Sequence, residues 1–170
     1  AHLIDALALA REAGIDFDAQ IIGEGELAGE LAQRIEDRGL SDSCRLLGAR
    51  TQNEVRSLLE NSDVFVAPCV PGADGNIDGL PTVILESMAV GTPVIATFVS
   101  GIPEVVINGR TGVLVPPASA SALAEALGDV ASGRVPARDL ARGARALIEE
   151  TYDSHVQAAR LASLEGEEER

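Results

Sequence analysis

Two carboxylates in residues 78–97, DGLPTVILESMAVGTPVIAT, are the first residues whose type and spacing suggest chemistry. Asp78 precedes Gly79 and Pro81, and Glu86 follows eight residues later inside an otherwise apolar run. Unpaired carboxylates are rare in buried helices and strands. Glu86 therefore needs either a ligand or a charged partner within the protein.

The start of the helix expected from about Pro81 is suited to bind phosphate. Proline fits the first turn, Thr82 and Val83 would offer unbonded amide groups, and Gly79 lets a ligand approach the backbone closely. Glu86 lies roughly 6 Å further along the helix axis, so a bound phosphate would lie between two acids. Two acids beside a phosphate can accept hydrogen bonds from hydroxyl groups, and a nucleotide sugar carries hydroxyl groups on both sides of its diphosphate. The pattern also allows a helix-capping first acid and an ion pair between the second acid and an arginine.

Apolar runs of strand length alternate with helical patterns along the chain. We expect strands at 17–23, 45–49, 64–69, 93–97 and 111–117. We expect helices over 1–13, 81–90 and 140–148, a short helical turn within 101–109, and a last helix from near Asp153. Three more helices are expected: one that carries Leu27, Leu31 and Ile35, one that Thr51 caps, and one that carries Leu123, Leu127 and Val130. This order predicts an α/β fold with a doubly wound, Rossmann-like parallel sheet covered on both faces. Such a fold normally begins with a strand, whereas this pattern begins with a helix.

The composition favours one globular domain and argues against several classes of partner. Hydrophobic residues make up 46% of 170 residues, enough for a core, and the net charge of −14 disfavours a nucleic-acid or anionic-membrane surface. No apolar run reaches the roughly 20 residues that cross a bilayer, and no signal peptide is recognisable. Cys44 and Cys69 lack metal-ligand spacing, which predicts reduced thiols in a cytoplasmic protein. With two histidines and an incomplete calcium loop around Asp74 and Asp78, we predict no metal site.

The segment from Asp78 resembles the signature of group 1 glycosyltransferases, the retaining GT-B enzymes of glycosyltransferase family 4. Their donor domain carries an acid-x7-acid motif of the form E-G-x-P-x-x-x-x-E-A-M-A-x-G-x-P-V, and this chain has D-G-L-P-T-V-I-L-E-S-M-A-V-G-T-P-V. Further similar stretches are IIGEGEL at 21–27, RLLG at 45–48, DVFVAP at 63–68, GIPE at 101–104 and NGRTGVLVPP at 108–117.

The resemblance implies the carboxyl-terminal, nucleotide-sugar-binding half of a two-domain enzyme. In the family the first acid accepts hydrogen bonds from donor-sugar hydroxyls, adjacent amides meet the sugar and the diphosphate, and the second acid binds the ribose. The matching residues are Asp78, which is the predicted catalytic residue, then Gly79, Leu80, Pro81, Thr82 and Val83 for the amides, and Glu86 for the ribose.

Four further residues are predicted to line the donor site. For each of them a purely structural role is the alternative. Arg50 resembles a position that packs against the base in some members, and a solvated loop arginine is the alternative. Glu104 resembles a position near the donor, and an acid in the first turn of a helix is the alternative. Gly23 and Gly25 lie in the GEGEL turn between a strand and a helix. Most glycine-rich turns of this kind only cap the helix that follows.

The departures from the family pattern imply a fragment. Asp78 is one methylene shorter than the usual Glu, which could change the sugar hydroxyl that it reaches. The family's diphosphate-clamping Arg and Lys, and its amino-terminal acceptor domain, precede the position of residue 1. We therefore expect a nucleotide-sugar-binding domain at 1–164, a disordered acidic tail at 165–170, and the acceptor domain of the same enzyme as partner, which could hold the enzyme at the inner membrane face. The family's strand order, 3-2-1-4-5-6, places the absent strand between 17–23 and 64–69.

The leading hypothesis is therefore the donor domain of a retaining glycosyltransferase. It would use a nucleotide-diphosphate sugar, without metal or other cofactor, and a glycan or lipid-linked acceptor. A nucleotide-sugar epimerase of GT-B architecture and a non-catalytic nucleotide-sugar-binding module are the alternatives.

Overall fold

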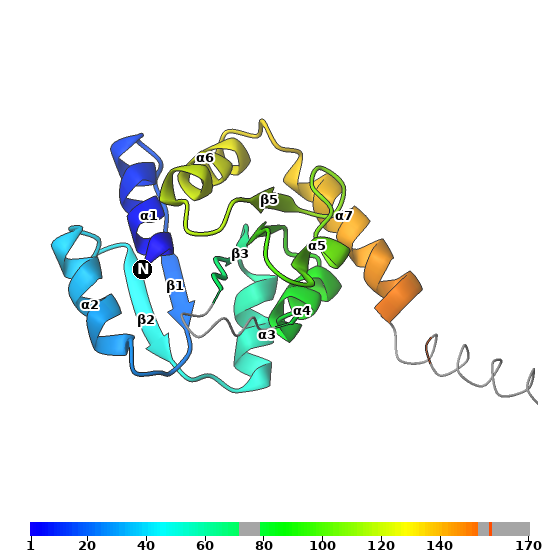
Figure 1. Ribbon diagram of the computed structural model, residues 1–170, viewed down its shortest axis with the longest axis horizontal. Coiled ribbons are helices and arrows are strands. Elements are labelled where there is room, and N and C mark those ends of the chain that lie inside the picture. Colours follow the sequence, from blue (N-terminus) through cyan, green and yellow to red (C-terminus); the bar gives the residue numbers. More distant parts are fainter. Residues whose placement is uncertain (72–78, 153–156, 158–170) are drawn as a thin grey trace, which may run out of the picture.

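The computed structural model describes residues 1–71, 79–152 and 157 (Figure 1). The helices are α1 (His2–Glu12), α2 (Ala28–Asp37), α3 (Gln52–Glu60), α4 (Thr82–Val90), α5 (Ile102–Val105), α6 (Ala120–Ala131) and α7 (Ala137–Leu147), which continues into a π-helical turn, η1 (Ile148–Tyr152). The strands are β1 (Ala19–Ile22), β2 (Cys44–Gly48), β3 (Phe65–Ala67), β4 (Val94–Thr97) and β5 (Val113–Val115). The five expected strands and the expected helices up to residue 152 are confirmed. The helix expected near Asp153 and the tail at 165–170 lie outside the described residues.

The strands form two parallel sheets rather than one continuous sheet. β1 pairs with β2, and β4 lies between β3 and β5. Within the described part of the chain, β1 and β3 are not hydrogen-bonded to each other, so direct closure of the two flanking strands is not observed. The separation falls where the resemblance predicts a further strand. That a segment outside these 170 residues fills this place stays a prediction.

Strand β4 is covered on both faces, as expected for a doubly wound sheet. All four of its residues are buried. Val94 and Ala96 pack with α4, α5 and α7 on one face, and Ile95 packs with α1 and α6 on the other. Because successive strand side chains point to opposite faces, helices on both sides are required to bury this run. The predicted α/β class is therefore confirmed.

Helix α1, together with α6, connects the two sheets. Ile4 and Leu7 pack over β1 and β2, whereas Ala6 packs with the β3–β5 sheet. Leu127 of α6 contacts both of these hydrophobic clusters, and Figure 1 shows α1 lying beside α6. The packing of apolar side chains thus holds together two sheets between which no backbone hydrogen bonds are described.

Two local expectations need correction. Leu27 was expected on the buried face of a helix, but it is the residue before α2 and is 62% exposed, because the GEGEL turn delays the helix start. Pro81 was expected in the first turn of its helix and instead occupies the N-cap position of α4, with an extended ψ of 123°.

The state of the two cysteines and the absence of a long apolar helix among the described residues match what the sequence predicted. Cys44 and Cys69 are not joined in a disulfide, and burial raises the pKa of the Cys44 thiol. Across the part of the chain that the structure describes, no helix has both the length and the apolar character to span a bilayer.

An ion-pair cluster between α1 and α2 generates a pH-dependent prediction. The Asp5 carboxylate, whose side chain is 17% exposed, accepts hydrogen bonds from Arg34 at 2.6 and 3.1 Å and pairs with Arg38 at 2.7 Å. These arginines hold the pKa of Asp5 below its usual value of 3.8. The cluster therefore stabilises the fold fully above about pH 4, and this contribution is lost as the pH falls through the lowered pKa.

We expect Asp5→Asn to lower the free energy of unfolding by about 1–2 kcal/mol at pH 7. The difference from the wild type should begin to shrink below about pH 4 and disappear once the pH has fallen below the lowered pKa of Asp5. Urea unfolding between pH 3 and pH 7 measures both effects. Asp42→Asn is the matched control, because Asp42 also pairs with an arginine, Arg11, but is 77% exposed; an equal loss in both variants would contradict the prediction.

Candidate functional site

The start of α4 and the turn after β4 come together at the carboxyl end of the β3–β5 sheet. A Cβ placed on Gly101 would lie 3.6 Å from Leu80 Cβ and 3.9 Å from the carbonyl carbon of Gly79. Gly101 follows β4 by four residues, and Leu80 precedes α4 by two. The structure thus brings together two segments that lie about twenty residues apart in the sequence.

The first turn of α4 has no side-chain cap. Within the described residues, no side-chain oxygen is bonded to the amides of its first turn, and that turn contains no acid. Thr82 and Val83 are its first two residues, whose amides have no acceptor within an α-helix. Such a turn attracts an anion, because the amide groups and the helix dipole both favour negative charge.

Glu86 lies one turn further along α4 and is half-buried. Among the described residues no arginine or hydrogen-bond donor is paired with its carboxylate, in contrast to Asp5 of α1, Glu60 of α3 and Asp139 of α7. The alternative of a structural ion pair therefore receives no support from the described part of the chain. Asp78, the predicted catalytic residue, lies outside the described residues.

Glu104 lies beside the same contact. It is exposed in α5, and its Oε1 is 3.9 Å from the Cβ position of Gly101. Its position in the first turn of α5 also fits the dipole alternative. Gly101 itself was not among the predicted site residues, although the GIPE motif contained it.

The end of β4 is fixed by a buried hydroxyl that was also not predicted. Thr97 Oγ1 donates to the carbonyl oxygen of Cys69 at 2.6 Å. Cys69 follows β3 by two residues, so this bond ties the ends of two neighbouring strands together. It holds the carbonyl group of Cys69, from which the chain continues toward Asp78.

The other predicted residues lie at the ends of β1 and β2. Gly23 has a φ of 141°, which favours glycine, and its amide donates to the carbonyl oxygen of Gly48 at 3.0 Å. Gly25 is exposed, and a Cβ there would meet nothing within 4 Å. Neither glycine is shown in contact with the start of α4 in the described part of the chain.

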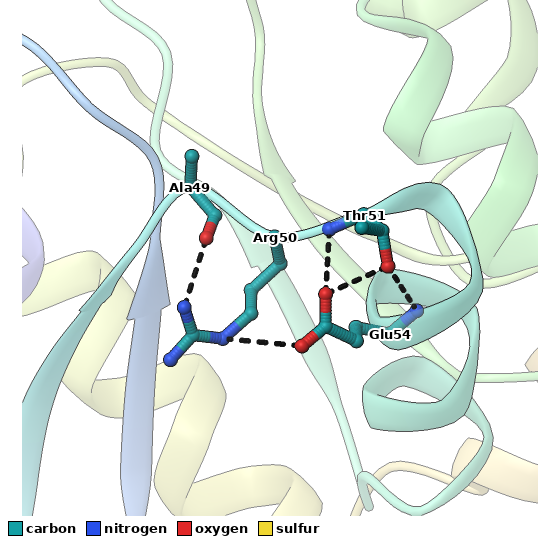
Figure 2. A network of polar contacts seen from close by, with 4 residues as sticks. All are labelled: Ala49, Arg50, Thr51 and Glu54. Atoms are coloured by element: carbon teal, nitrogen blue, oxygen red, sulfur yellow. Dashed lines mark hydrogen bonds and ion pairs between the residues drawn. The ribbon is translucent and has the colours of Figure 1, made fainter.

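Arg50 belongs to a local network at the start of α3 (Figure 2). Its Nη1 donates to the carbonyl oxygen of Ala49 at 2.8 Å, and its Nε is 4.0 Å from Glu54 Oε1. Glu54 and Thr51 form a reciprocal capping box, and the hydrogen bonds from Thr51 are the main reason that the pKa of Glu54 is lowered. The capping role expected for Thr51 is confirmed, and the ordinary alternative for Arg50 agrees with these contacts.

Two surface hollows lie away from these residues. One, of about 550 Å³, lies between Gly91 at the carboxyl end of α4 and Arg138, Arg142 and Arg145 of α7. The other, of about 440 Å³, lies between β5, α6 and the start of α7. Within residues 1–71, 79–152 and 157, no group of three His, Cys, Asp or Glu side chains could hold a metal ion.

Comparison with known proteins identifies the class. Residues 1–132 match the family model of the group 1 glycosyl transferases. The chain is 34% identical over 161 residues to the amylovoran biosynthesis glycosyltransferase AmsK of Erwinia amylovora, and 38% identical over 164 residues to the putative colanic acid biosynthesis glycosyltransferase WcaL of Escherichia coli K12. Each match covers 95% of this chain and 40% of the relative.

Solved structures agree in fold. Anabaena Alr3699/HepE in complex with UDP-glucose superposes with a TM-score of 0.81 at 27% identity, over 95% of this chain and 44% of that chain. The C-terminal domain of the group 1 protein LpcC from Francisella tularensis superposes with a TM-score of 0.76 at 24% identity, over 90% of this chain and 78% of that chain.

The chain belongs to the group 1 glycosyltransferases, and it corresponds to their carboxyl-terminal, Rossmann-like domain. It spans about 40% of the length of the curated relatives named above.

The tie between β3 and β4 can be tested with a matched pair of substitutions. Thr97→Val removes the hydroxyl that bonds to Cys69, and Thr92→Val removes a buried hydroxyl that donates to Leu59 O at 2.7 Å at the other end of β4. We expect each to lower stability by about 1–2 kcal/mol, because a buried carbonyl loses its donor.

Only Thr97→Val should also speed amide hydrogen exchange in peptides that cover residues 69–71 and 79–83. Hydrogen–deuterium exchange followed by mass spectrometry measures this difference. Equal exchange in the two variants would mean that the Thr97 hydroxyl does not order this edge.

Proposed function

We propose that this domain binds the nucleotide-diphosphate sugar of a retaining glycosyltransferase. The observation that carries the proposal is the half-buried carboxylate of Glu86, which has no partner among the described residues. It lies one turn inside a helix whose N-cap residue, Pro81, makes no side-chain cap bond. The match to the group 1 family and the UDP-glucose complex of Alr3699/HepE support it.

In this proposal the diphosphate binds at the first turn of α4. The amides of Thr82 and Val83 donate to phosphate oxygens, and the absence of an acid in this turn avoids repulsion of the anion. Gly79 and Gly101 lack side chains, so the ligand approaches the backbone closely. Glu86 accepts hydrogen bonds from the ribose hydroxyls, and Asp78 accepts hydrogen bonds from hydroxyls of the donor sugar.

The proposed reaction transfers the sugar with retention of its anomeric configuration to a glycan or lipid-linked acceptor. Residues 1–164 form the donor domain, and an amino-terminal domain of the same enzyme supplies the acceptor site. Cations for the diphosphate come from residues outside this chain, and the proposed reaction needs no metal ion. Titration of the full-length enzyme with EDTA tests that last point, because unchanged turnover is expected.

The role of Glu86 is tested by Glu86→Gln in the full-length enzyme. We expect about tenfold weaker binding of the nucleotide sugar, equal to about 1.4 kcal/mol, because a neutral amide oxygen is a weaker acceptor than a carboxylate. Glu125→Gln on α6 is the control, since Glu125 is also a helical acid without a described ion pair.

Isothermal titration with UDP-glucose, UDP-galactose and GDP-mannose measures the affinities. Equal affinity in the Glu86 variant and the wild type would remove Glu86 from the site. A wild-type enzyme that binds none of the three, nor UDP or GDP, would contradict the proposed function as a whole.

We further expect residues 1–170 alone to transfer no sugar. The acceptor site and the proposed diphosphate-binding cations lie outside this chain, so a bound donor would have neither acceptor nor charge stabilisation for the leaving group. A radiolabelled transfer assay with a nucleotide-sugar panel measures this, with the full-length enzyme as the positive control. Turnover by the isolated domain at a rate close to that of the full-length enzyme would show that the domain is complete in itself.

A further inference from the structure

A row of arginines lines the larger of the two surface hollows, where α7 passes the end of α4. Arg138, Arg142 and Arg145 follow one another at intervals of four and three residues, which places them on one side of the helix. Together with Gly91 they line the hollow of about 550 Å³. Positive charge is therefore gathered around a volume that is typical of small-molecule sites.

Arg138 stands out because the chain is strongly acidic. The sequence has 27 acidic residues against 13 basic ones. Nine of the described arginines form an ion pair with an aspartate or a glutamate. Arg110 and Arg138 have no such partner within residues 1–71, 79–152 and 157. Of these two, only Arg138 lines a described hollow, so its guanidinium is available to an anion from solution.

The other two arginines of the hollow also keep hydrogen-bond donors. Arg142 donates to Asp139 at 2.7 Å, and Arg145 donates to Glu149 at 2.6 Å. Each guanidinium has five N–H groups, and most of them have no acceptor in the described part of the protein. Both acids are more than half exposed, and ion pairs between exposed side chains contribute little to stability. These pairs are therefore weak competitors for a doubly charged anion.

The end of α4 offers little negative charge to repel such an anion. The last four carbonyl groups of a helix have no donor within the helix. In α4 the amide of Gly91 donates to Met88 O, and the next amide donates to Ser87 O. Arg145 donates to Ala89 O. Because three of the four carbonyl groups are already bonded, the hollow is faced mainly by guanidinium groups at this point.

The hollow lies at the edge of the sheet opposite the proposed donor site. Helix α4 begins after the carboxyl end of β3 and ends before the amino end of β4, so Gly91 lies at the amino edge. Reaction sites of doubly wound folds lie at the carboxyl edge. A ligand in the hollow would therefore occupy a second site, separate from the first turn of α4.

The chemistry of the hollow matches a phosphate monoester better than other anions. The planar guanidinium group binds two phosphate oxygens at once, and arginines one helical turn apart can approach one phosphate together. A phosphate monoester carries about −1.5 to −2 charges at pH 7, more than the single charge of Asp139 or Glu149. The same two acids on the rim of the hollow disfavour an extended anionic surface such as a membrane, which would have to approach both of them.

We propose that this hollow binds the phosphate group of a soluble phosphate monoester, with Arg138 and Arg142 donating to its oxygens. The inference does not depend on the proposed function, and it adds a second ligand site to the domain. Arg145 lines this site and also bonds to the end of α4.

The experiment uses the full-length enzyme, saturated with UDP or GDP so that phosphate cannot bind at the proposed donor site. Isothermal titration at physiological salt then measures the affinity for glucose 6-phosphate, glucose 1-phosphate and inorganic phosphate. In the hollow variant, which combines Arg138→Gln with Arg142→Gln, we expect about tenfold weaker binding of at least one probe. The control variant combines Arg45→Gln with Arg56→Gln, which removes the same charge from exposed positions outside the hollow.

A third variant gives an effect of opposite sign. Asp139→Asn removes a negative charge from the rim of the hollow and frees Arg142, so we expect it to bind the same probe more tightly than the wild type does. This variant keeps the inference testable if the hollow variant does not fold. Weaker or unchanged binding in Asp139→Asn would count against the site.

The remaining outcomes each decide the inference. It would be overturned if the wild type bound none of the three probes, or if the hollow and control variants bound them equally. Loss of UDP and GDP binding in the hollow variant would place the nucleotide itself in the hollow and overturn it as well. Binding to vesicles of phosphatidic acid and phosphatidylcholine, without binding to a soluble probe, would assign the arginines to a membrane surface and contradict it. A wild-type enzyme that binds a probe through Arg138 and Arg142 but binds neither UDP nor GDP would support the inference and contradict the proposed function.

Discussion

The burial of β4 is the constraint on which the rest of the structure depends. It is bonded to β3 on one side and β5 on the other, and helices cover both of its faces. A strand enclosed in this way cannot shift by one residue without moving its side chains to the wrong face. Its carboxyl end is therefore a fixed point, and both Thr97 and the turn at 98–104 take their positions from it.

The site is built from this fixed end toward α4. Thr97 ties the end of β4 to the segment after β3, and Gly101 lies against the residues that open α4. The other end of α4 is also held, because Gly91 ends the helix with a left-handed φ of 85° and Arg145 of α7 donates to Ala89 O at 2.5 Å. The helix is thus anchored at its carboxyl end, while no side chain of the described residues caps its first turn. This combination suits a site whose ligand supplies the missing interactions at the helix start.

The sequence predicted features that are set by nearby residues. The cap predicted at Thr51 depends on residues within one helical turn, and the structure adds the reciprocal bond from Glu54. Gly91 ends α4 as glycine commonly does. Leu27 was misplaced because its spacing fits a helical period, whereas the turn before it decides where α2 begins. The approach of Gly101 to Leu80 and the bond from Thr97 to Cys69 depend on tertiary packing between distant segments, so spacing alone could not reveal them. Periodicity also could not show that α1 connects two sheets, because that depends on which strands are paired.

The central claim, that the first turn of α4 is the donor site, is tested most directly by hydrogen–deuterium exchange of the full-length enzyme with and without a bound nucleotide sugar. The account predicts slower exchange in peptides covering residues 79–90 and 98–105, with little change in α7, which lines the 550 Å³ hollow at the opposite end of α4. Protection concentrated on α7, with residues 79–90 unchanged, would contradict it.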